Sequence, residues 1–239
     1  QSGLAMTMPY SNPNSNKKNM NKRILFFFLI HLYCFIFACA QTRWSFELHG
    51  GVIHNLRLPL VIYQNGYPDI RIDKAHFHSE PLNDPYYWDW RFTKWFDKKS
   101  IEFEAIHHKL YLVNKPAEVQ HFGISHGYNM LMFNHGREVG KFIVRLGLGS
   151  VLLHAESTVR GMEYPVGAGF DWKGYRLSGI LLNIGFARQF KFGKTFFINT
   201  EVKMNASVTN APIVNGYARA HIVVFQWILG PGFNWSVKE

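Results

Sequence analysis

The residues whose types and spacing are best suited to chemistry lie between positions 126 and 160. Ser150, His154 and Glu156 supply a hydroxyl, an imidazole and a carboxylate, which are the groups of a nucleophile, its general base and the acid that orients the base. His126 is a second candidate base, and Arg160 could hold a phosphate group through two parallel hydrogen bonds. Together these residues predict a catalytic site for the hydrolysis of an acyl ester.

Metal-ligating residues are few and poorly spaced. His76 and His78 stand two residues apart, and His107 and His108 are adjacent, but no cysteine or carboxylate spacing completes a zinc site around either pair. The sequence contains neither a phosphate-binding P-loop nor a dinucleotide-binding glycine motif. We therefore expect no metal and no cofactor.

The segments that must position the candidate groups alternate between apolar and polar residues over ten to fifteen residues, which is the period of a β-strand. Phe196, Ile198 and Val202, for example, share one face, while Asn199 and Glu201 share the other. No segment after residue 41 has a convincing helical period. The predicted strands are 43–53, 86–96, 101–112, 119–133, 140–153, 177–190, 195–207 and 221–235.

The connections between these strands differ in length. The predicted connections are 54–85 and 154–176, which are long, 208–220, which is moderate, and 97–100, 113–118, 134–139 and 191–194, which are short. If 97–100, 134–139 and 191–194 lie on one side, every long connection lies on the other. Outer-membrane barrels have this asymmetry of short periplasmic turns and long extracellular loops. The sequence therefore predicts an all-β fold, an eight-stranded antiparallel transmembrane outer-membrane β-barrel.

The residue types on the two faces of the predicted strands favour a barrel. In 119–133 the alternation assigns Phe122, Ile124 and Tyr128 to an apolar outer face and Gly123 and Gly127 to a narrow lumen. The alternative is a soluble periplasmic β-sandwich that binds a ligand, in which the apolar faces would pack against each other.

Charged residues on the inward phase predict a plugged lumen. These residues are Glu47, Glu102, Glu104, Arg145, Glu201 and Lys203. Isolated charges lose too much solvation inside a membrane protein, so we expect them to form a network of ion pairs. Eight strands leave an interior just wide enough for side chains, which argues against an open pore.

Several polar side chains fall on the lipid-facing phase near the extracellular ends of adjacent strands. They are His107, Lys109, Gln120, His126, Ser150 and His154. Polar groups are tolerated near the membrane interface but not near its midplane. We interpret them as the upper boundary of the lipid band or as a site for lipid headgroups, with His107, Lys109 and Arg160 as the headgroup-binding candidates.

The N-terminal 40 residues contain the signals of export. Residues 20–40 combine a short basic segment, an apolar run and Ala38-Cys39-Ala40, as in a cleaved signal peptide. A membrane-spanning helix and a lipidated Cys39 are the alternatives. Residues 1–19 are interpreted as an upstream extension, and 41–239 as the barrel domain. Both cysteines, Cys34 and Cys39, fall inside the predicted signal, so no disulfide is expected after Gln41.

The net charge of +10 does not indicate a nucleic-acid partner. Four of the 26 Lys and Arg residues lie in 1–40, which holds no acid, so the rest of the chain has 22 basic and 16 acidic residues, a net charge of +6. No compact basic patch remains to be explained.

In this layout the chain resembles small outer-membrane barrels of the OmpA and OmpX kind, and it is similar in layout to the lipid A deacylase barrels. The Ala38-Cys39-Ala40/Gln41 junction and the dense Tyr, Trp and Lys content resemble outer-membrane proteins of Bacteroidetes-type Gram-negative bacteria. The deacylase resemblance implies a His-x-Ser pair on a late strand, but the nearest segment here reads Glu201-Val-Lys203-Met-Asn205. No catalytic residue carries over.

Three functions follow from this sequence. The first is a non-catalytic integral outer-membrane barrel with a plugged, charged lumen, whose extracellular loops contact lipopolysaccharide or a protein partner. The second is a lipid A-modifying acyl hydrolase with its His/Ser site on the outer wall near the extracellular leaflet. The third is the soluble periplasmic sandwich. The oligomeric state is not encoded in any of these patterns.

Overall fold

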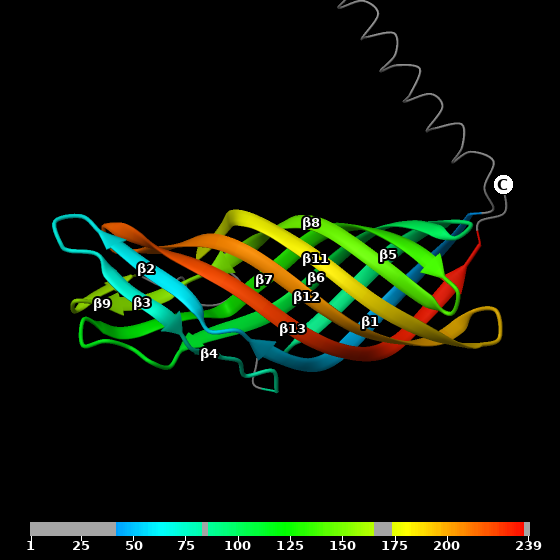
Figure 1. Cartoon of the computed structure of the whole chain (residues 1–239), viewed down its shortest axis with the longest axis horizontal. Coiled ribbons are helices and arrows are strands. Elements are labelled where there is room, and N and C mark those ends of the chain that lie inside the picture. Colours follow the sequence, from blue (N-terminus) through cyan, green and yellow to red (C-terminus); the bar gives the residue numbers. More distant parts are fainter. Residues whose placement is uncertain (1–41, 83–85, 165–173, 237–239) are drawn as a thin grey trace, which may run out of the picture. The chain divides into compact units, whose positions relative to one another are not determined.

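Eight long antiparallel strands of the chain close into a ring (Figure 1). The computed structural model describes residues 42–82, 86–164 and 174–236, without the side chains of Ser125 and His126. In ring order the strands are β1 (Thr42–Asn55), β5 (Trp88–Phe96), β6 (Lys99–Leu112), β7 (Val119–Val139), β8 (Phe142–His154), β11 (Tyr175–Phe192), β12 (Phe196–Ile213) and β13 (Gly216–Trp235). Pairing of β13 with β1, which sets Trp44 opposite Trp235, closes the ring. The predicted eight-stranded antiparallel barrel is confirmed.

Three tight turns lie at the same end of the barrel as Thr42 and Trp235; we call this the turn end, and the opposite end the loop end. Phe96 pairs with Lys99 and Val139 pairs with Phe142, which leaves two-residue turns between them. Asp97 and Gly140 have φ of 55° and 61°, the left-handed conformation that such hairpin turns require. The predicted asymmetry between short and long connections is therefore present.

The predicted connection 208–220 is wrong, because β12 and β13 continue through it. Ile213 pairs with Gly216, and only Val214 and Asn215 form the turn. The inward residues here include Ala211 and Ala218, whose small side chains disguise the strand pattern.

Five short strands extend the barrel at the loop end, where long loops were expected. They are β2 (Leu58–Gln64), β3 (Ile70–Ala75), β4 (Phe77–His78), β9 (Glu156–Val159) and β10 (Met162–Tyr164). Strand β2 continues the pairing along β13 beyond β1, β4 continues along β6 beyond β5, and β9 pairs with β7. The connections 54–85 and 154–176 are thus largely part of the sheet.

The outer wall around the middle of the barrel is apolar. Val202, Phe225 and Trp227 are 57%, 43% and 59% exposed, whereas charged side chains beside them on the strands point inward. The apolar faces do not meet, so the β-sandwich alternative is wrong. An apolar exterior around a charged interior is the side-chain distribution of a transmembrane outer-membrane barrel. In the described segments, no helix is long and apolar enough to cross a membrane.

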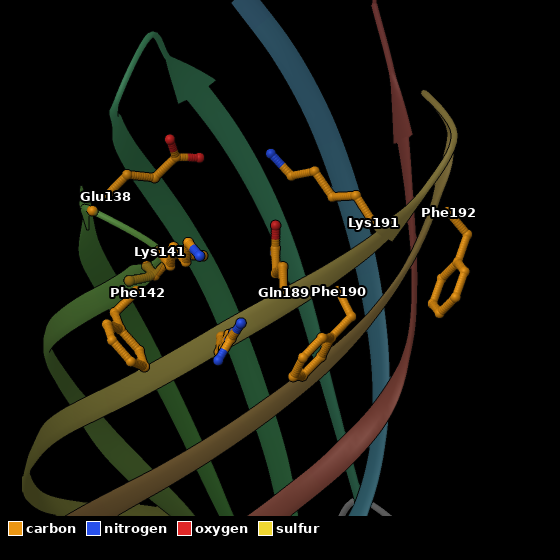
Figure 2. Close-up of a pocket in the computed structure, with 10 residues that line it drawn as sticks. Glu138, Lys141, Phe142, Gln189, Phe190, Lys191 and Phe192 are labelled. Atoms are coloured by element: carbon orange, nitrogen blue, oxygen red, sulfur yellow. The ribbon is translucent and has the colours of Figure 1, made fainter.

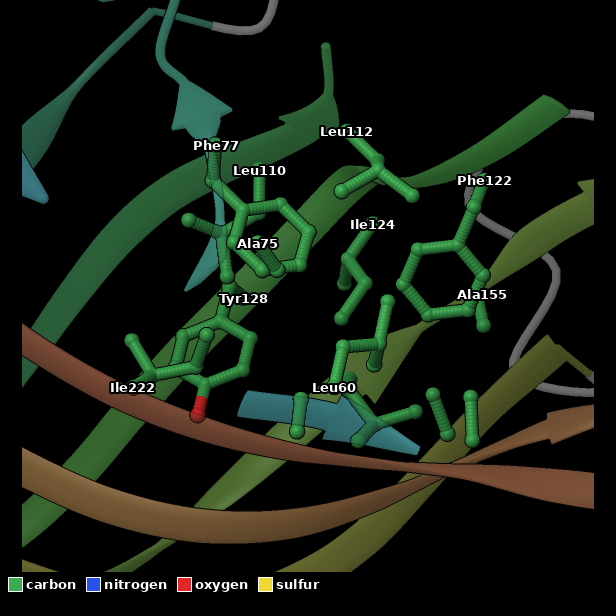
Figure 3. Close-up of a cluster of buried hydrophobic side chains, with 14 of the residues drawn as sticks. Leu60, Ala75, Phe77, Leu110, Leu112, Phe122, Ile124, Tyr128, Ala155 and Ile222 are labelled. Carbon is green, nitrogen blue, oxygen red and sulfur yellow. The ribbon is translucent and has the colours of Figure 1, made fainter. Parts of the chain in front are cut away.

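The interior changes character along the barrel axis. Near the turn end Trp95 and Phe197 are fully buried, and charged residues fill the middle. Toward the loop end an apolar core takes over, in which Leu60 of β2, Phe77 of β4, Leu110 of β6 and Phe122 of β7 pack together (Figure 3).

This core corrects the predicted faces of β7. Phe122, Ile124 and Tyr128 were assigned to the lipid side, but all three are buried in the core at the loop end. Alternation separates two faces of a strand without identifying the inner one. Here the barrel continues past the lipid band, where an apolar interior is favoured as in any water-soluble domain.

Candidate functional site

Two arginines organise the charged centre of the lumen. Arg91 of β5 donates from Nη2 to Glu104 Oε1 at 2.7 Å and to Glu201 Oε2 at 2.8 Å. Arg145 of β8 donates from Nε to Glu102 Oε2 at 2.8 Å and from Nη1 to Glu201 Oε2 at 3.1 Å. All five side chains are fully buried. The planar guanidinium groups connect strands on opposite sides of the ring, because each presents several donors at fixed angles.

The network continues toward β1 through a lysine and a histidine. Lys203 of β12 contacts both Asp89 and Glu104. His49 of β1 places Nδ1 3.2 Å from Asp89 Oδ1 and Nε2 3.2 Å from Glu47 Oε2. Each carboxylate in the network therefore has at least one cationic or imidazole neighbour, as burial of charge requires.

All six residues predicted for the lumen lie in this network, and three further members were not predicted. Asp89 and Arg91 alternate with the aromatic residues Trp88, Trp90 and Phe92. The same alternation places Asp89 and Arg91 inside, so the signal was present in the sequence. His49 lies on the inward phase of β1 beside Glu47, and alternation could have identified it as well.

Two aromatic rings, Trp95 and Phe197, are buried in the lumen at the turn end. Trp95 is fully buried and its Nε1 donates to Ser45 Oγ at 3.2 Å. Arg43 covers this ring, with its Cζ 4.7 Å from the ring centroid, and its Nη2 lies 2.6 Å from Glu138 Oε1. Phe197 fills the space beside Gly232, where a Cβ atom would collide with the ring. The rings, the ion network and the apolar core thus lie at three successive levels of the interior.

The predicted hydrolase residues have separate partners. Ser150 Oγ donates to the carbonyl oxygen of Gly179 at 2.8 Å. The buried ring of His154 lies 4.9 Å from the ring of Tyr175, and Glu156 Oε2 lies 3.6 Å from His121 Nε2.

Strands β8 and β9 both pair with β7, but at different positions along it. Ser150 of β8 stands opposite Leu131, and Glu156 of β9 stands opposite Gly123. The contacts described thus do not join Ser150, His154 and Glu156 into a triad, and the side chain of His126 lies outside the described residues.

The exposure predicted for His107 and Lys109 is wrong, since both are only 4% exposed. Residues 79–81 and Tyr87 line a small cavity together with His107 and Lys109. The His107 ring stacks on Trp88 at 5.4 Å, and its Nδ1 lies 2.7 Å from Asn129 Oδ1. These contacts hold the sheet together where β5 begins.

Arg160 connects two hairpins at the loop end through hydrogen bonds. Its Nη1 donates to Gln64 Oε1 at 2.9 Å and its Nη2 to the carbonyl oxygen of Pro68 at 2.7 Å. The guanidinium also lies over the Tyr67 ring, 4.9 Å from its centroid. The side chain predicted to hold a phosphate therefore joins the β9–β10 turn to the β2–β3 hairpin.

A basic and aromatic patch lies on the outer wall at the loop end, and sequence reasoning missed it. Arg219 on β13 and Arg71 on β3 both stand opposite Val61 of β2, one on each side. The Tyr63 and Tyr217 rings are 5.0 Å apart, and the Arg219 guanidinium lies 5.8 Å and 5.7 Å from them. We define the loop-end patch as Val61, Tyr63, Arg71, Tyr217 and Arg219. Its strands are distant in sequence or in a predicted loop, which is why no local motif indicated it.

No group of three or more His, Cys, Asp and Glu side chains in the described segments could hold a metal ion.

No protein-family model matches the chain, and no curated protein matches it. Among solved structures, it is similar to Ail, the attachment invasion locus protein of Yersinia pestis, at 11% identity, with 82% of this chain and 99% of Ail covered and a TM-score of 0.37. The outer membrane protein OprG from Pseudomonas aeruginosa is 13% identical over 83% of this chain and 97% of its own, with a TM-score of 0.36. Neisserial surface protein A is 8% identical over 83% and 98%, with a TM-score of 0.34. The fold assignment depends on the strand ring and the side-chain placement described above.

Proposed function

We propose that this chain is an integral outer-membrane protein that acts through its surface rather than as a pore or an enzyme. The observation that carries the proposal is the closed strand ring with an apolar exterior and an interior filled at three levels. A barrel of this kind presents the membrane and the extracellular medium with a rigid outer wall. Export would proceed through the signal peptide predicted at 20–40, so the mature protein is expected to begin at Gln41 when its N-terminus is sequenced.

The partner that the outer wall supports best is lipopolysaccharide, bound at the loop-end patch. Outward residues of β13 change from Arg219 and His221 to Val223 and Phe225 as the strand enters the apolar belt. Arg219 therefore lies about 13 Å along the strand from Val223, at a rise of about 3.3 Å per residue. Two arginines at that height can pair with phosphate groups, while the tyrosine rings offer flat surfaces to sugars.

Binding of purified lipopolysaccharide to the full chain in neutral-lipid nanodiscs tests this proposal. The double variant R71Q/R219Q is expected to bind about 25-fold more weakly, since each cation near an anionic lipid surface is worth about 1 kcal/mol. K74Q is the control for loss of a single exposed charge outside the patch, because Lys74 is exposed on β3. Equal affinity of wild type and R71Q/R219Q would refute the patch. Failure of the wild type to insert into nanodiscs would refute the membrane assignment itself.

A further inference from the structure

The turn end of the barrel has a large excess of positive charge. Outside the lumen network, the described residues at this end include nine basic side chains and two carboxylates. The basic residues are Arg43, Lys94, Lys98, Lys99, Arg137, Lys141, Arg188, Lys191 and Lys194, and the acids are Asp97 and Glu138. Glu138 is already paired with Arg43 at 2.6 Å. Most of this positive charge therefore has no internal counterion.

Part of this charge lines a pocket with a volume of about 530 Å³ (Figure 2). The pocket exists because β8 begins at Phe142 while β11 continues to Phe192. The last pair between the two strands is Ile143 with Ala187, so residues 188–192 pair with β12 alone in the part of the chain described. Its size is within the range of ligand clefts, about 300–1,000 Å³.

The lining of this pocket has a basic part and an aromatic part, and it also includes Glu138, whose carboxylate is paired with Arg43. Lys141, Arg188 and Lys191 supply three positive charges, and no carboxylate of the described residues lies within ion-pair distance of any of them. The rings of Phe142 and Phe190 lie nearer the barrel body than the Lys191 amine (Figure 2). The Arg188 guanidinium lies 4.9 Å from the Phe190 centroid and 5.9 Å from that of Phe142.

This arrangement matches an amphipathic anion and not a small soluble one. Phe142 and Phe190 are 39% and 43% exposed on the outer wall, where acyl chains would contact them. The cations stand next to them at the turn end, where the phosphate plane of the inner leaflet would lie. A soluble anion would gain from the cations but would leave the aromatic rings uncovered.

We propose that this pocket binds the phosphate headgroup of an anionic phospholipid from the periplasmic leaflet, with Lys141, Arg188 and Lys191 contacting the headgroup and Phe142 and Phe190 contacting an acyl chain. The site lies at the opposite end of the barrel from the loop-end patch. It depends on the membrane assignment but not on lipopolysaccharide binding.

Phospholipid retained by the full chain, measured by native mass spectrometry after extraction from nanodiscs, tests the site. Nanodiscs of phosphatidylcholine with a minor fraction of phosphatidylglycerol supply the probe. Wild type is expected to retain phosphatidylglycerol preferentially. The variant K141Q/R188Q/K191Q should lower its apparent affinity at least tenfold, because each cation contributes about fivefold. K98Q/K99Q/K194Q is the matched control, with the same loss of charge outside the pocket, and should change the affinity less than about twofold.

Two further measurements separate the lipid from free phosphate. Excess inorganic phosphate should leave the retained phosphatidylglycerol unchanged, and F142S/F190S should lower its retention while the barrel still migrates as a folded species in unheated gels. Equal losses in the two charge triples would show general electrostatic attraction and overturn the site. Displacement by phosphate, with no effect of F142S/F190S, would overturn the lipid as its ligand. Insertion of the wild type into nanodiscs of phosphatidylcholine alone tests separately whether the chain is a membrane protein.

Discussion

The two halves of the barrel interior have opposite chemistry although the same strands build both. On β6 the inward residue changes from Glu104, fully buried in the ion network, to Ile106, fully buried in the apolar core, within two positions. On β13 the change runs from Gln226 to Val224 and Ile222. The interior chemistry is therefore set by position along the axis and not by the strand.

The outer wall changes in the opposite direction at about the same level. On β13, Phe225 and Trp227 lie on the outer wall at the level of the charged half. Arg219 and His221 lie on the outer wall at the level of the apolar half. In the half surrounded by lipid, the interior holds the polar groups. In the half surrounded by water, the interior holds the apolar ones, as in a soluble protein. The comparison teaches that the surroundings of the wall determine whether the inward side chains of an alternating strand are polar or apolar.

The variant expected to destabilise the charged half most is Arg91→Met. Its guanidinium lies within 3.4 Å of four carboxylates, those of Glu47, Glu102, Glu104 and Glu201. Removing it leaves buried carboxylates without compensation, so the free energy of unfolding should fall by about 3–5 kcal/mol. Urea unfolding in lipid vesicles, followed by tryptophan fluorescence, measures the change.

The exposed cation Arg137 provides the control for this variant. Arg137→Met should change the free energy of unfolding by less than about 0.5 kcal/mol, as is usual for surface positions. A similar small change for Arg91→Met would mean that the ion network contributes little to stability.

The ring was predictable from sequence because alternation survives on every long strand. The eight predicted strands overlap the eight observed ones, from 43–53 on Thr42–Asn55 to 221–235 on Gly216–Trp235. The inner face of β7 was not predictable by the same rule, since Phe122 and Tyr128 are as apolar as residues in contact with lipid. Only contacts with β2 and β4, which are distant in sequence, identify the loop end as a core.

The positions of the candidate-site residues were predictable where the alternation along a single strand determines them. They were not predictable where the pairing between strands determines them. Phase places Glu102 and Glu104 in the lumen together. In contrast, Ser150 and Glu156 are close in sequence but stand opposite different positions of β7, Leu131 and Gly123, and Arg160 reaches Gln64 across 96 positions. Sequence proximity therefore does not establish which partner each of these side chains has.

Leu110→Ala tests the apolar half and should cost somewhat less than Arg91→Met. Leu110 is fully buried among Phe77, Phe122 and Ile124. Truncation removes apolar contacts and leaves a cavity, for a loss of about 3 kcal/mol in the free energy of unfolding. Leu82→Ala is the control, because Leu82 is 84% exposed. A loss below 1 kcal/mol for Leu110→Ala would show that the loop end is loosely packed.

Gly232→Ala tests the packing between the charged half and the turn end. A methyl group at Gly232 would collide with the Phe197 ring, so the variant should lose about 1–3 kcal/mol through overpacking. The double variant G232A/F197L should recover part of this loss, because the smaller side chain makes room. Additive losses in the same unfolding assay would contradict direct contact between the two positions.

Arg160→Gln should have the smallest effect and should act on the loop end alone. The variant loses the guanidinium contacts with Gln64 and Pro68, but these lie at an exposed hairpin junction, so the loss of global stability should be about 1 kcal/mol or less. Hydrogen exchange should instead accelerate in β2, β3, β9 and β10, while amides of β1, β5 and β12 near the ion network keep their protection. Faster exchange throughout the ring would show that the two halves unfold together. Faster exchange confined to the loop end would show that the apolar half is a separate unit, held by its own core and fastened by Arg160.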